Sequence, residues 1–287
     1  MADPAAVAGP RPAPRLSVVI VSHNSGPLLR EAIDSVLSQA LEGGLELILA
    51  DNASAAGQFD ELPPDPRLRL LLNPDNRGFG AACNQAAVMA RGEFLLLLNP
   101  DCLLPEEALE TLLAVRASEK IDLLGARLLN TDGSLQAASY RRDPRPLGAV
   151  RQAFGMSGTA TGFDTSTLVT DVDAVSGALM LMETARFHEL GGFDEGFRLH
   201  VEDLDLCRCA RERGLRVAVA NRVEVTHAKG ASSRARPVWV EWQKHRGMWR
   251  YFRKHDAHAT PGLLRPLLWL GLWARFVVAA ALAWWRR

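Results

Sequence analysis

Four runs of apolar residues, each ending abruptly at a polar turn, dominate the first hundred residues. The runs are 16–21, 45–50, 68–72 and 94–98. Their apolar, partly β-branched character predicts strands in the interior of a sheet. Between them, apolar residues recur at helical spacing after Pro27 and again over 81–90, which predicts two helices. Strands that alternate with helices predict an α/β fold with a mostly parallel central sheet.

Polar side chains follow each of these four strands. They are Ser22, His23 and Asn24 after the first strand, Asp51 after the second, Asn76 after the third, and Asn99 with Asp101 after the fourth. Parallel strands end at one edge of the sheet, and open α/β sheets bind ligands there, so we expect a nucleotide at this edge. Asp101 can hold a hard divalent cation, which in turn can hold a diphosphate. A plain turn after a core strand is the alternative for this residue.

Glycine-rich phosphate-binding motifs are missing from the sequence. No G-x-G-x-x-G follows the first strand, and no G-x-x-x-x-G-K-[S/T] occurs anywhere. These absences argue against a Rossmann dehydrogenase and against a P-loop NTPase. A diphosphate at this edge would therefore need a metal ion or side chains to hold it.

The second half of the chain continues the alternation less regularly. We expect a helix over 106–116, a strand pair around 123–129 with a turn at 130–133, and a mobile loop over 140–165. A strand follows over 173–182, in which Gly177 lets a ligand or the backbone come close. We then expect helices over 184–190 and 203–213 and strands over 215–220 and 223–226. His227 follows the last of these strands. A single histidine there is commonly structural, but this one could complete a metal site with Asp101.

Three acidic residues crowd the start of the predicted 203–213 helix: Glu202, Asp203 and Asp205. Acidic residues are favoured at helix N-termini for electrostatic reasons alone, so capping is one interpretation. Three acids within four residues exceed what a cap needs. A carboxylate held there could instead act as a general base toward a hydroxyl group.

The last part of the chain differs in charge from the body. From Lys229 onward there are 12 Lys and Arg against two Asp and Glu, whereas the whole chain has a formal net charge of zero. We expect an amphipathic helix over 238–255 and a strongly apolar one over 263–285. Arg265 and Arg275 interrupt the apolar segment, which favours a helix lying at a membrane interface over one that spans it. Packing on the body or on a second subunit is the alternative.

The ends and the cysteines give weaker signals. Residues 1–14 are rich in Ala and Pro without an apolar core segment, which predicts a disordered leader and no secretory signal. Cys83, Cys102, Cys207 and Cys209 have neither zinc-site nor disulfide-framework spacing. We expect buried thiols in a reducing compartment.

These motifs, taken together and in this order, resemble the family 2 glycosyltransferases, which have a GT-A fold, and among them the bacterial rhamnosyltransferase-like members. The matching positions are 17–24, 51–54, 76–80 with Asn84, 99–101, Gly177, 191–194, 202–205, and His227 with Gly230. The similarity runs through residues 15–233, about four fifths of the chain. It implies a domain over 15–235, preceded by the 1–14 leader and followed by a helical tail over 236–287.

The resemblance also implies roles for individual residues. Asp51 would recognise a uracil or thymine ring, with Ser22, His23 and Asn24 flanking it. Asn76, Gly78, Asn84, Asn99 and Gly177 would belong to the donor site. Asp101 and His227 would hold Mg²⁺ or Mn²⁺, and Asp203, with Glu202 beside it, would be the catalytic base. Two positions depart from the family pattern: Asn99 stands where an Asp is frequent, and His23 where a Tyr is frequent.

The function implied is an inverting glycosyltransferase. It would move a sugar, plausibly rhamnose from dTDP-rhamnose, onto a lipid-linked saccharide in cell-envelope polysaccharide synthesis. We expect it in the cytoplasm, peripheral on an anionic inner membrane face, with a homodimer through the tail as a further option. The alternatives are a UDP-hexose transferase of the same family, a catalytically silent nucleotide-sugar-binding scaffold, and a nucleic-acid binder using the basic tail. The Trp and Leu content of the tail, with no nucleic-acid motif, argues against nucleic acid.

Overall fold

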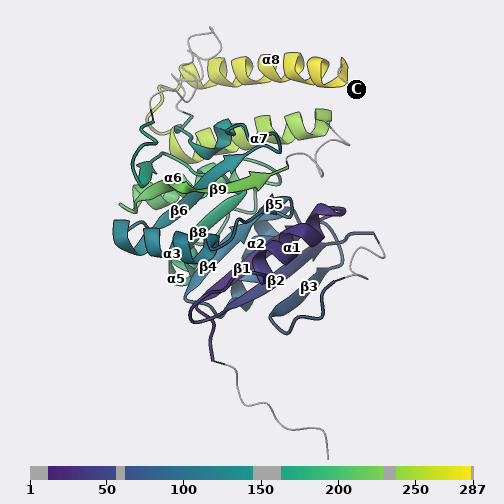
Figure 1. The fold of residues 1–287 in the computed structure, drawn as a ribbon. Coiled ribbons are helices and arrows are strands. Elements are labelled where there is room, and N and C mark those ends of the chain that lie inside the picture. Colours follow the sequence, from purple (N-terminus) through teal and green to yellow (C-terminus); the bar gives the residue numbers. More distant parts are fainter. Residues whose placement is uncertain (1–11, 56–61, 145–162, 229–236, 286–287) are drawn as a thin grey trace, which may run out of the picture.

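One mixed sheet forms the centre of the molecule in the computed structural model, which describes residues 12–55, 62–144, 163–228 and 237–285 (Figure 1). The four predicted strands are present and parallel, in the spatial order β3-β2-β1-β4. Their bounds are Leu16–Ser22 (β1), Leu45–Asn52 (β2), Leu68–Asn73 (β3) and Phe94–Leu98 (β4). The predicted α/β architecture and the shared edge of the four strand ends are therefore confirmed.

The sheet continues beyond β4 with mixed pairing. β8 pairs antiparallel with β4 and with β6, β6 pairs parallel with β9, and both β5 and β7 pair antiparallel with β9. The bounds are Cys102–Leu103 (β5), Leu123–Leu129 (β6), Val169–Asp171 (β7), Leu179–Glu183 (β8) and Val217–His227 (β9). The pairing of β5 with β9 brings Cys102 opposite His227, so residues far apart in the sequence meet at the end of β4.

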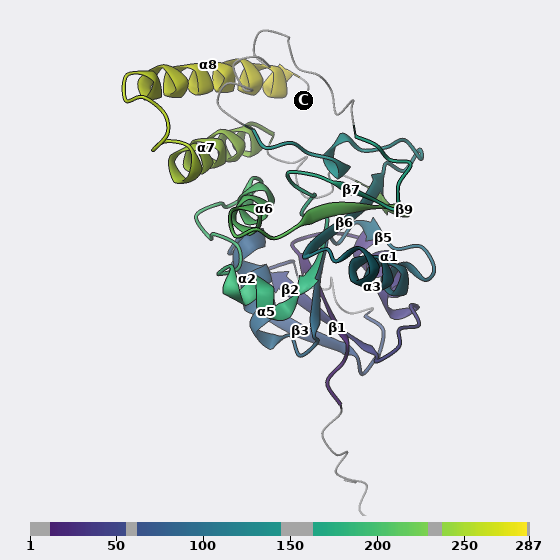
Figure 2. The same ribbon diagram turned by 90° about the vertical axis from the view of Figure 1, so that its left-hand side faces the viewer.

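Helices cover both faces of the sheet (Figures 1 and 2). α1 (Leu28–Leu37) and α3 (Ala108–Glu119) pack on one face, whereas α2 (Phe79–Met89), α5 (Thr184–Glu189) and α6 (Glu202–Glu212) pack on the other. Successive side chains of β1 point to opposite faces, so Val18 and Ile20 join one core and Val19 and Val21 the other. This double burial explains why the strand sequences are continuously apolar rather than alternating.

Three details of the second half differ from the prediction. The strand expected over 173–182 begins only at Leu179, because the chain turns at 176–179 with the Leu179 N–H donating to the Ser176 carbonyl at 3.2 Å. The turn at 130–133 is present, but its second arm makes only a single bridge, Leu129 to Leu135, and the 3₁₀ turn η1 (Ala137–Ser139) follows. The short strands β5 and β7 were not predicted. Of the loop expected over 140–165, residues 145–162 lie outside the described residues.

The two strands expected over 215–220 and 223–226 are one strand with an irregularity. Pairing passes from Ala126–Ala220 to Arg127–Glu224, which leaves 221–223 without partners on β6. The buried side chain of Asn221 fixes this irregularity. It accepts from the Tyr140 hydroxyl at 2.7 Å and donates to Thr170 Oγ1 at 2.8 Å. Such an inserted segment changes which face the following side chains occupy.

Two long helices at one end of the molecule, α7 (Pro237–His255) and α8 (Leu264–Trp285), lie side by side (Figures 1 and 2). By length and composition alone, α8 could cross a membrane, and none of its apolar window is buried. The amphipathic helix expected over 238–255 is present as α7, but its buried side is partly polar. Phe252 is buried, but Trp242 is 42% exposed, and Gln243, Tyr251 and His255 are buried instead.

Candidate functional site

The strand-tip edge consists of the turns after β1 to β4, namely 22–25, 51–54, 76–78 and 99–101. Hydrogen bonds join the first three turns. His23 Nδ1 lies 2.7 Å from the Asn52 carbonyl, and Asn52 Nδ2 donates to the Gly78 carbonyl at 3.1 Å. A carbonyl only accepts, so Nδ1 of a neutral His23 carries the proton and Nε2 is left as the acceptor. The structure thus brings Ser22, His23, Asn24, Asp51 and Gly78 together.

Asp51 is buried and capped by its own turn. Its Oδ2 accepts from the Ser54 N–H at 3.0 Å and its Oδ1 from the Ser54 hydroxyl at 2.5 Å. Each carboxylate oxygen has a second lone pair, which leaves acceptor capacity toward a ligand. Asn24 Oδ1 likewise accepts from the Ala55 N–H at 2.9 Å. These bonds account for the turn, and recognition of a base by Asp51 stays a prediction.

Asn76 and Asn84 serve the chain in different ways. Asn76 is exposed, and its side chain accepts from the Gly78 N–H at 3.0 Å, closing the turn before α2. Asn84 clamps the loop after α5: its Oδ1 accepts from the Phe193 N–H and its Nδ2 donates to the Phe193 carbonyl, both at 2.9 Å. The structure therefore gives Asn84 a structural role, while its predicted contact with a donor is not tested.

Asp101 and His227 are the best candidates for a metal site. His227 Nε2 lies 3.3 Å from Asp101 Oδ1, and both side chains are largely buried. Asn99 Nδ2 lies 3.4 Å from the same histidine nitrogen. Cys102 also lies within reach, but burial, first of all, and then the charge of Asp101 raise the pKa of its thiol well above the ordinary value. Cys102 is therefore a poor ligand for a hard cation, and carboxylate plus imidazole are what remain.

Gln136 fixes the orientation of His227. The Gln136 Nε2 donates to the His227 carbonyl at 2.7 Å and to the Leu129 carbonyl at 3.2 Å, so its Oε1 is the atom facing His227 Nδ1, at 3.0 Å. In a neutral His227, Nδ1 therefore carries the proton and Nε2 presents its lone pair toward Asp101. Metal-ligating histidines are typically held in this way. The residues present therefore fit a divalent cation that completes its coordination with diphosphate and water oxygens.

Asp203 lies at the start of α6 and is held by three donors. Its Oδ2 accepts from the Gly177 N–H at 2.9 Å and from Arg141 Nη2 at 2.5 Å, and its Oδ1 accepts from the Leu204 N–H at 2.8 Å. Burial by itself would raise the pKa of Asp203, but the positive charge of Arg141 and these hydrogen bonds outweigh it, so the pKa is lowered. Asp203 is therefore ionised at neutral pH.

Glu202 shows the opposite behaviour. Burial, with the negative charge of Asp203 as the second cause, raises its pKa to about 8. Within the described parts of the chain its Oε2 is buried and has no hydrogen-bond partner. Two adjacent carboxyl groups thus hold different protonation states at pH 7: Asp203 is charged and Glu202 is neutral.

A short turn connects the metal candidates with Asp203. The Ala178 carbonyl accepts from the Asn99 N–H at 2.9 Å, and the neighbouring Gly177 N–H donates to Asp203. A Cβ at Gly177 would lie 3.3 Å from Asp203 Cβ, so a larger residue would crowd the carboxylate. The chain is close-packed at Gly177, as expected, but the neighbour is the side chain of Asp203 rather than backbone, and a ligand at this glycine stays a prediction.

The α6–α7 wall consists of Arg141, Asp143, residues 200–211 and the α7 residues 247–255. At its centre, the buried side chain of Asp143 accepts hydrogen bonds from Arg208, from Arg211 at 2.8 Å and from the Tyr251 hydroxyl of α7. A second connection joins the helices directly, because Asp205 pairs with Lys254 at 2.7 Å and with His255 at 2.8 Å. Asp205 therefore belongs to the contact with α7 rather than to a helix cap.

Strained backbone precedes Glu202. His200 and Val201 have φ values of 61° and 76°, which a β-branched residue such as Val rarely adopts. Gly247 of α7 packs on this turn, since a Cβ there would lie 3.1 Å from Val201 Cγ2. Strain of this kind persists only where the surroundings enforce it, and it clusters at functional sites.

Sequence reasoning missed Arg141, Gln136, Asp143 and Tyr251. Arg141 and Asp143 fall in a stretch expected to be a loop, and Gln136 follows a turn without any periodic pattern. Nothing in the local sequence indicates that these residues contact Asp203, His227 or α7, because all of these contacts are long-range.

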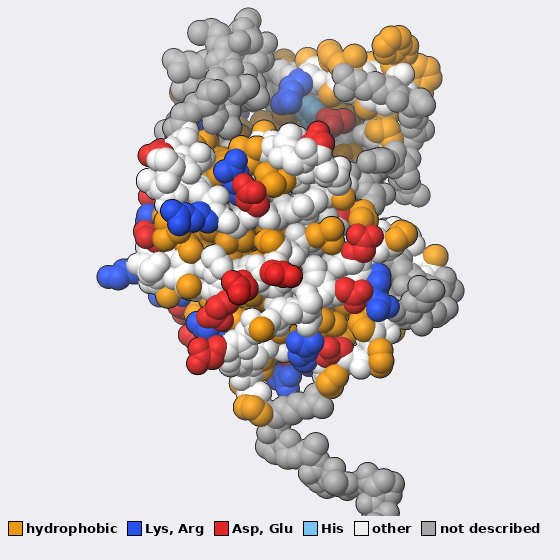
Figure 3. Space-filling model, viewed as in Figure 1, with side chains coloured by type: hydrophobic (Ala, Val, Ile, Leu, Met, Phe, Trp, Pro, Cys, Tyr) orange, Lys and Arg blue, Asp and Glu red, His pale blue; other side chains and the backbone are white. Residues whose placement is uncertain are grey.

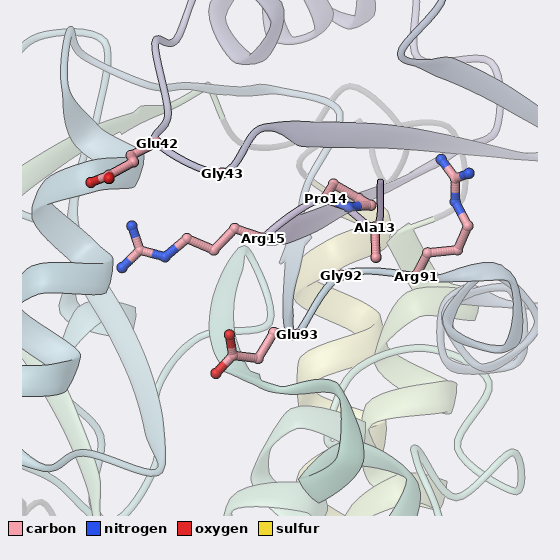
Figure 4. A pocket seen from close by; sticks show the side chains of 8 residues that line it. All are labelled: Ala13, Pro14, Arg15, Glu42, Gly43, Arg91, Gly92 and Glu93. Carbon is pink, nitrogen blue, oxygen red and sulfur yellow. The ribbon is translucent and has the colours of Figure 1, made fainter. Parts of the chain in front are cut away.

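Two other features do not belong to this site. A shallow hollow of about 740 Å³ lies at the amino ends of β1 and β4, the edge opposite to the strand tips, and Arg15, Glu42, Arg91 and Glu93 are among its lining residues (Figure 4). Asp205, Cys209 and His255 have the proximity needed for a metal site. Lys254 already occupies one oxygen of Asp205, so we interpret that group as an ion-pair cluster.

Comparison with known proteins gives a consistent picture. The model of the family described as glycosyl transferase family 2 matches residues 17–169, more than half of the chain. An N-acetylglucosaminyl-diphospho-decaprenol L-rhamnosyltransferase of Mycobacterium tuberculosis is 28% identical over 243 residues, which are 78% of this chain and 79% of that protein. The O-antigen biosynthesis protein RfbC of Myxococcus xanthus is 27% identical over 255 residues, 82% of this chain. The chain spans only 19% of the Myxococcus protein.

Solved structures share the fold at low sequence identity. The mannosyltransferase PcManGT from Pyrobaculum calidifontis, in complex with GDP-Man and Mn²⁺, superposes with a TM-score of 0.59 at 20% identity, covering 94% of this chain and 74% of its own. GalNAc-T7 with UDP, GalNAc and Mn²⁺ gives a TM-score of 0.60 at 18% identity, covering 90% of this chain and 54% of its own. The predicted GT-A fold is confirmed by these neighbours.

Proposed function

The chain belongs to glycosyl transferase family 2, and we propose that it moves a sugar from a nucleotide-sugar donor to a hydroxyl group of a lipid-linked saccharide, with inversion at the anomeric carbon. One observation carries the proposal. The turn at 177–178 bonds through the Ala178 carbonyl to Asn99, which adjoins the Asp101–His227 pair suited to a cation and a diphosphate, and through the Gly177 N–H to the ionised carboxylate of Asp203. Leaving-group binding and a base therefore lie on the two sides of one turn.

The side chains divide the chemistry between them. The oxygen of the acceptor hydroxyl bonds to the anomeric carbon, and Asp203 accepts the proton of that hydroxyl. At the same time the bond from the anomeric carbon to the diphosphate oxygen breaks. Asp101 and His227 would hold a divalent cation, which would supply Lewis-acid stabilisation of the leaving nucleoside diphosphate. A single displacement inverts the configuration and needs no covalent intermediate on the protein. Neutral Glu202 keeps a second negative charge away from Asp203.

For the donor we propose a dTDP-sugar, with dTDP-rhamnose first. The similarity to the mycobacterial rhamnosyltransferase supports this choice. That relative's name also includes a lipid-linked sugar, which supports the proposed acceptor class. A UDP-hexose is the alternative, because the strand-tip edge offers Asp51 and His23 to either pyrimidine. We place the reaction in the cytoplasm, at the membrane face where a lipid-linked acceptor is available.

A catalytically silent nucleotide-sugar-binding protein is the second candidate, and one observation favours it. Arg141 neutralises Asp203 directly, which lowers the basicity of the carboxylate. A silent protein would bind donor and cation without transferring sugar. Loss of activity on changing Asp203, with unchanged nucleotide binding, separates the two candidates.

The first experiment is calorimetric titration of dTDP, UDP and GDP, each with and without Mn²⁺, on the wild type, on Asp101→Ala and on Asp34→Ala. Asp34 is an exposed carboxylate of α1 paired with Arg30, so it serves as a matched control. We expect dTDP to bind best, to need Mn²⁺, and to lose binding only in Asp101→Ala. Tighter binding of UDP than of dTDP would make a UDP-sugar the proposed donor in place of a dTDP-sugar. No binding of any nucleotide would overturn the proposal.

Transfer itself is then measured with a panel of sugar donors and membrane-extracted acceptors. We expect radiolabelled sugar to appear in the lipid fraction with inverted anomeric configuration. Donor binding without transfer in every combination would favour the silent protein.

A further inference from the structure

The outward face of α8 has no protein partner among the described residues. It is mainly apolar: Leu267, Leu270, Val277, Val278, Trp284 and Trp285 are 55–82% exposed. The opposite face packs on α7, where Trp273 and Phe276 contact Trp242 at ring-centre distances of 4.8 and 5.5 Å. Figure 3 shows hydrophobic side chains gathered at this end of the molecule. Contiguous apolar surface of this extent marks an interaction site.

The charges around this face favour an anionic lipid surface over a protein. The charged side chains of α8 are Arg265 and Arg275, both exposed, and α7 adds exposed Arg246 and Arg253. α8 carries no acidic residue. Cations flanking an apolar face with several Trp residues are typical of helices that lie in the headgroup region.

The packing of α8 on α7 decides between lying on the membrane and crossing it. α8 has 22 residues, about 33 Å of helix, which is long enough to span. However, α7 runs beside it and carries Lys244, Arg250 and Lys254, and α7 is itself tied to the body through Asp143, Asp194 and Asp205. A spanning α8 would pull these charges, and the body behind them, into hydrocarbon.

We propose that α8 is an in-plane membrane anchor that binds an anionic bilayer surface through its outward face, and that α7 is the rigid connector between this anchor and the base. The connector reaches the site directly, because Gly247 packs on Val201, two residues before Asp203. The anchor thereby holds the α6–α7 wall close to the lipid surface. The closeness of the wall to the lipid surface matters for catalysis only if the acceptor is lipid-linked, so this last point rests on the proposed function.

Vesicle flotation of the full chain tests the anchor. We expect binding to vesicles of phosphatidylcholine mixed with phosphatidylglycerol, and weaker binding to phosphatidylcholine alone or at high salt. Val278→Asp, which places a charge on the outward face, should weaken binding about tenfold or more. The matched control is Val88→Asp, the same change at a 78% exposed position of α2, which should bind as the wild type does. Equal loss in both variants, or no binding by the wild type, would overturn the proposal.

Tryptophan fluorescence tests the orientation. All seven Trp residues of the chain lie in α7 and α8, so the intrinsic signal reports on the anchor alone. Lipids brominated near the headgroup should quench it more strongly than lipids brominated near the chain end. Stronger quenching by the deep bromines would indicate a spanning helix and would contradict the in-plane arrangement.

Two further outcomes are distinguishable. A stable dimer in solution that does not bind vesicles, and that Val278→Asp converts to a monomer, would assign the outward face to a second copy and overturn the anchor. Vesicle binding without sugar transfer would leave the anchor intact and refute only the proposed function. Sugar transfer to lipid without vesicle binding would support the proposed function and overturn the anchor.

Discussion

The strand-tip edge and the α6–α7 wall face the same site but are built differently. At the edge, polar side chains bond mainly to backbone groups of their own or adjacent turns, as Asp51 does with Ser54. In the wall, charged side chains from distant segments bond to one another, as Asp143 does with Arg208 and Arg211. The edge offers lone pairs fixed by local geometry, whereas the wall sets protonation states. The first arrangement suits binding and the second suits proton transfer.

The largest expected effect is a loss of catalysis, which depends on the wall, without a loss of nucleotide binding, which depends on the strand-tip edge. Asp203→Asn removes the base but not the strand tips, so kcat for sugar transfer should fall by about 10²–10⁴ while Mn²⁺-dependent nucleotide binding persists. Single-turnover kinetics and calorimetry measure the two quantities. Asp122→Asn, which changes a carboxylate that caps the Arg216 N–H, should alter neither. Activity of Asp203→Asn close to wild type would remove Asp203 from the mechanism.

A smaller effect should appear at the edge. Gln136→Ala frees Nδ1 of His227 and lets the ring turn, so affinity for Mn²⁺ in the presence of nucleotide should fall about 10–100-fold. Because Gln136 acts only through His227, saturating Mn²⁺ should restore kcat. Gln39→Ala, another buried glutamine that bonds to carbonyl groups, provides the control. A kcat defect that excess Mn²⁺ does not repair would show that Gln136 is merely structural.

In the wall, Arg141→Gln should move the pH profile rather than abolish activity. Arg141 lowers the pKa of Asp203, and the base must be ionised, so the acidic limb of kcat against pH should shift upward by about 1–3 units. Activity at high pH should approach that of the wild type. Arg142→Gln, which removes a cation stacked on Phe163, is the neighbouring control. An unshifted limb would mean that Arg141 does not control the titration of Asp203.

The smallest expected effect concerns stability. The pKa of Glu202 is raised to about 8 in the folded protein from 4.5, so stability falls as pH rises from 4.5 to about 8. Glu202→Gln removes this loss, and thermal unfolding should show a gain in Tm of roughly 5 °C at pH 8 and little at pH 4.5. Glu46→Gln should have the opposite sign: burial raises the pKa of Glu46, but Arg91, Ser17 and Arg69 outweigh it and lower the pKa. A pH-independent gain in Glu202→Gln would refute the raised pKa.

The two regions also differ in how far they were predictable. The turns after β1 to β4 were foreseen because a buried strand followed by polar residues is a local pattern, and parallel pairing then brings the tips together. Arg141, Gln136 and Tyr251 were not foreseen, because their partners lie 62, 91 and 108 residues away. Asp203 was proposed from its acidic neighbourhood and the resemblance, but its ionised state depends on contacts that no local pattern carries.

The irregularity at 221–223 in β9 has a consequence for the metal candidates. Before it, the even-numbered Ala218 and Ala220 face the α1–α3 core, and after it the odd-numbered Val223 and Val225 do. The inserted residues therefore act as a phase shift in the two-residue period of the strand, and His227 inherits the new phase. Uninterrupted alternation through the same residues would instead place Glu224 and Thr226 on the α1–α3 face and turn His227 to the opposite face, away from Asp101. The irregularity at 221–223, which includes neither metal candidate, thus determines on which face of the sheet His227 lies.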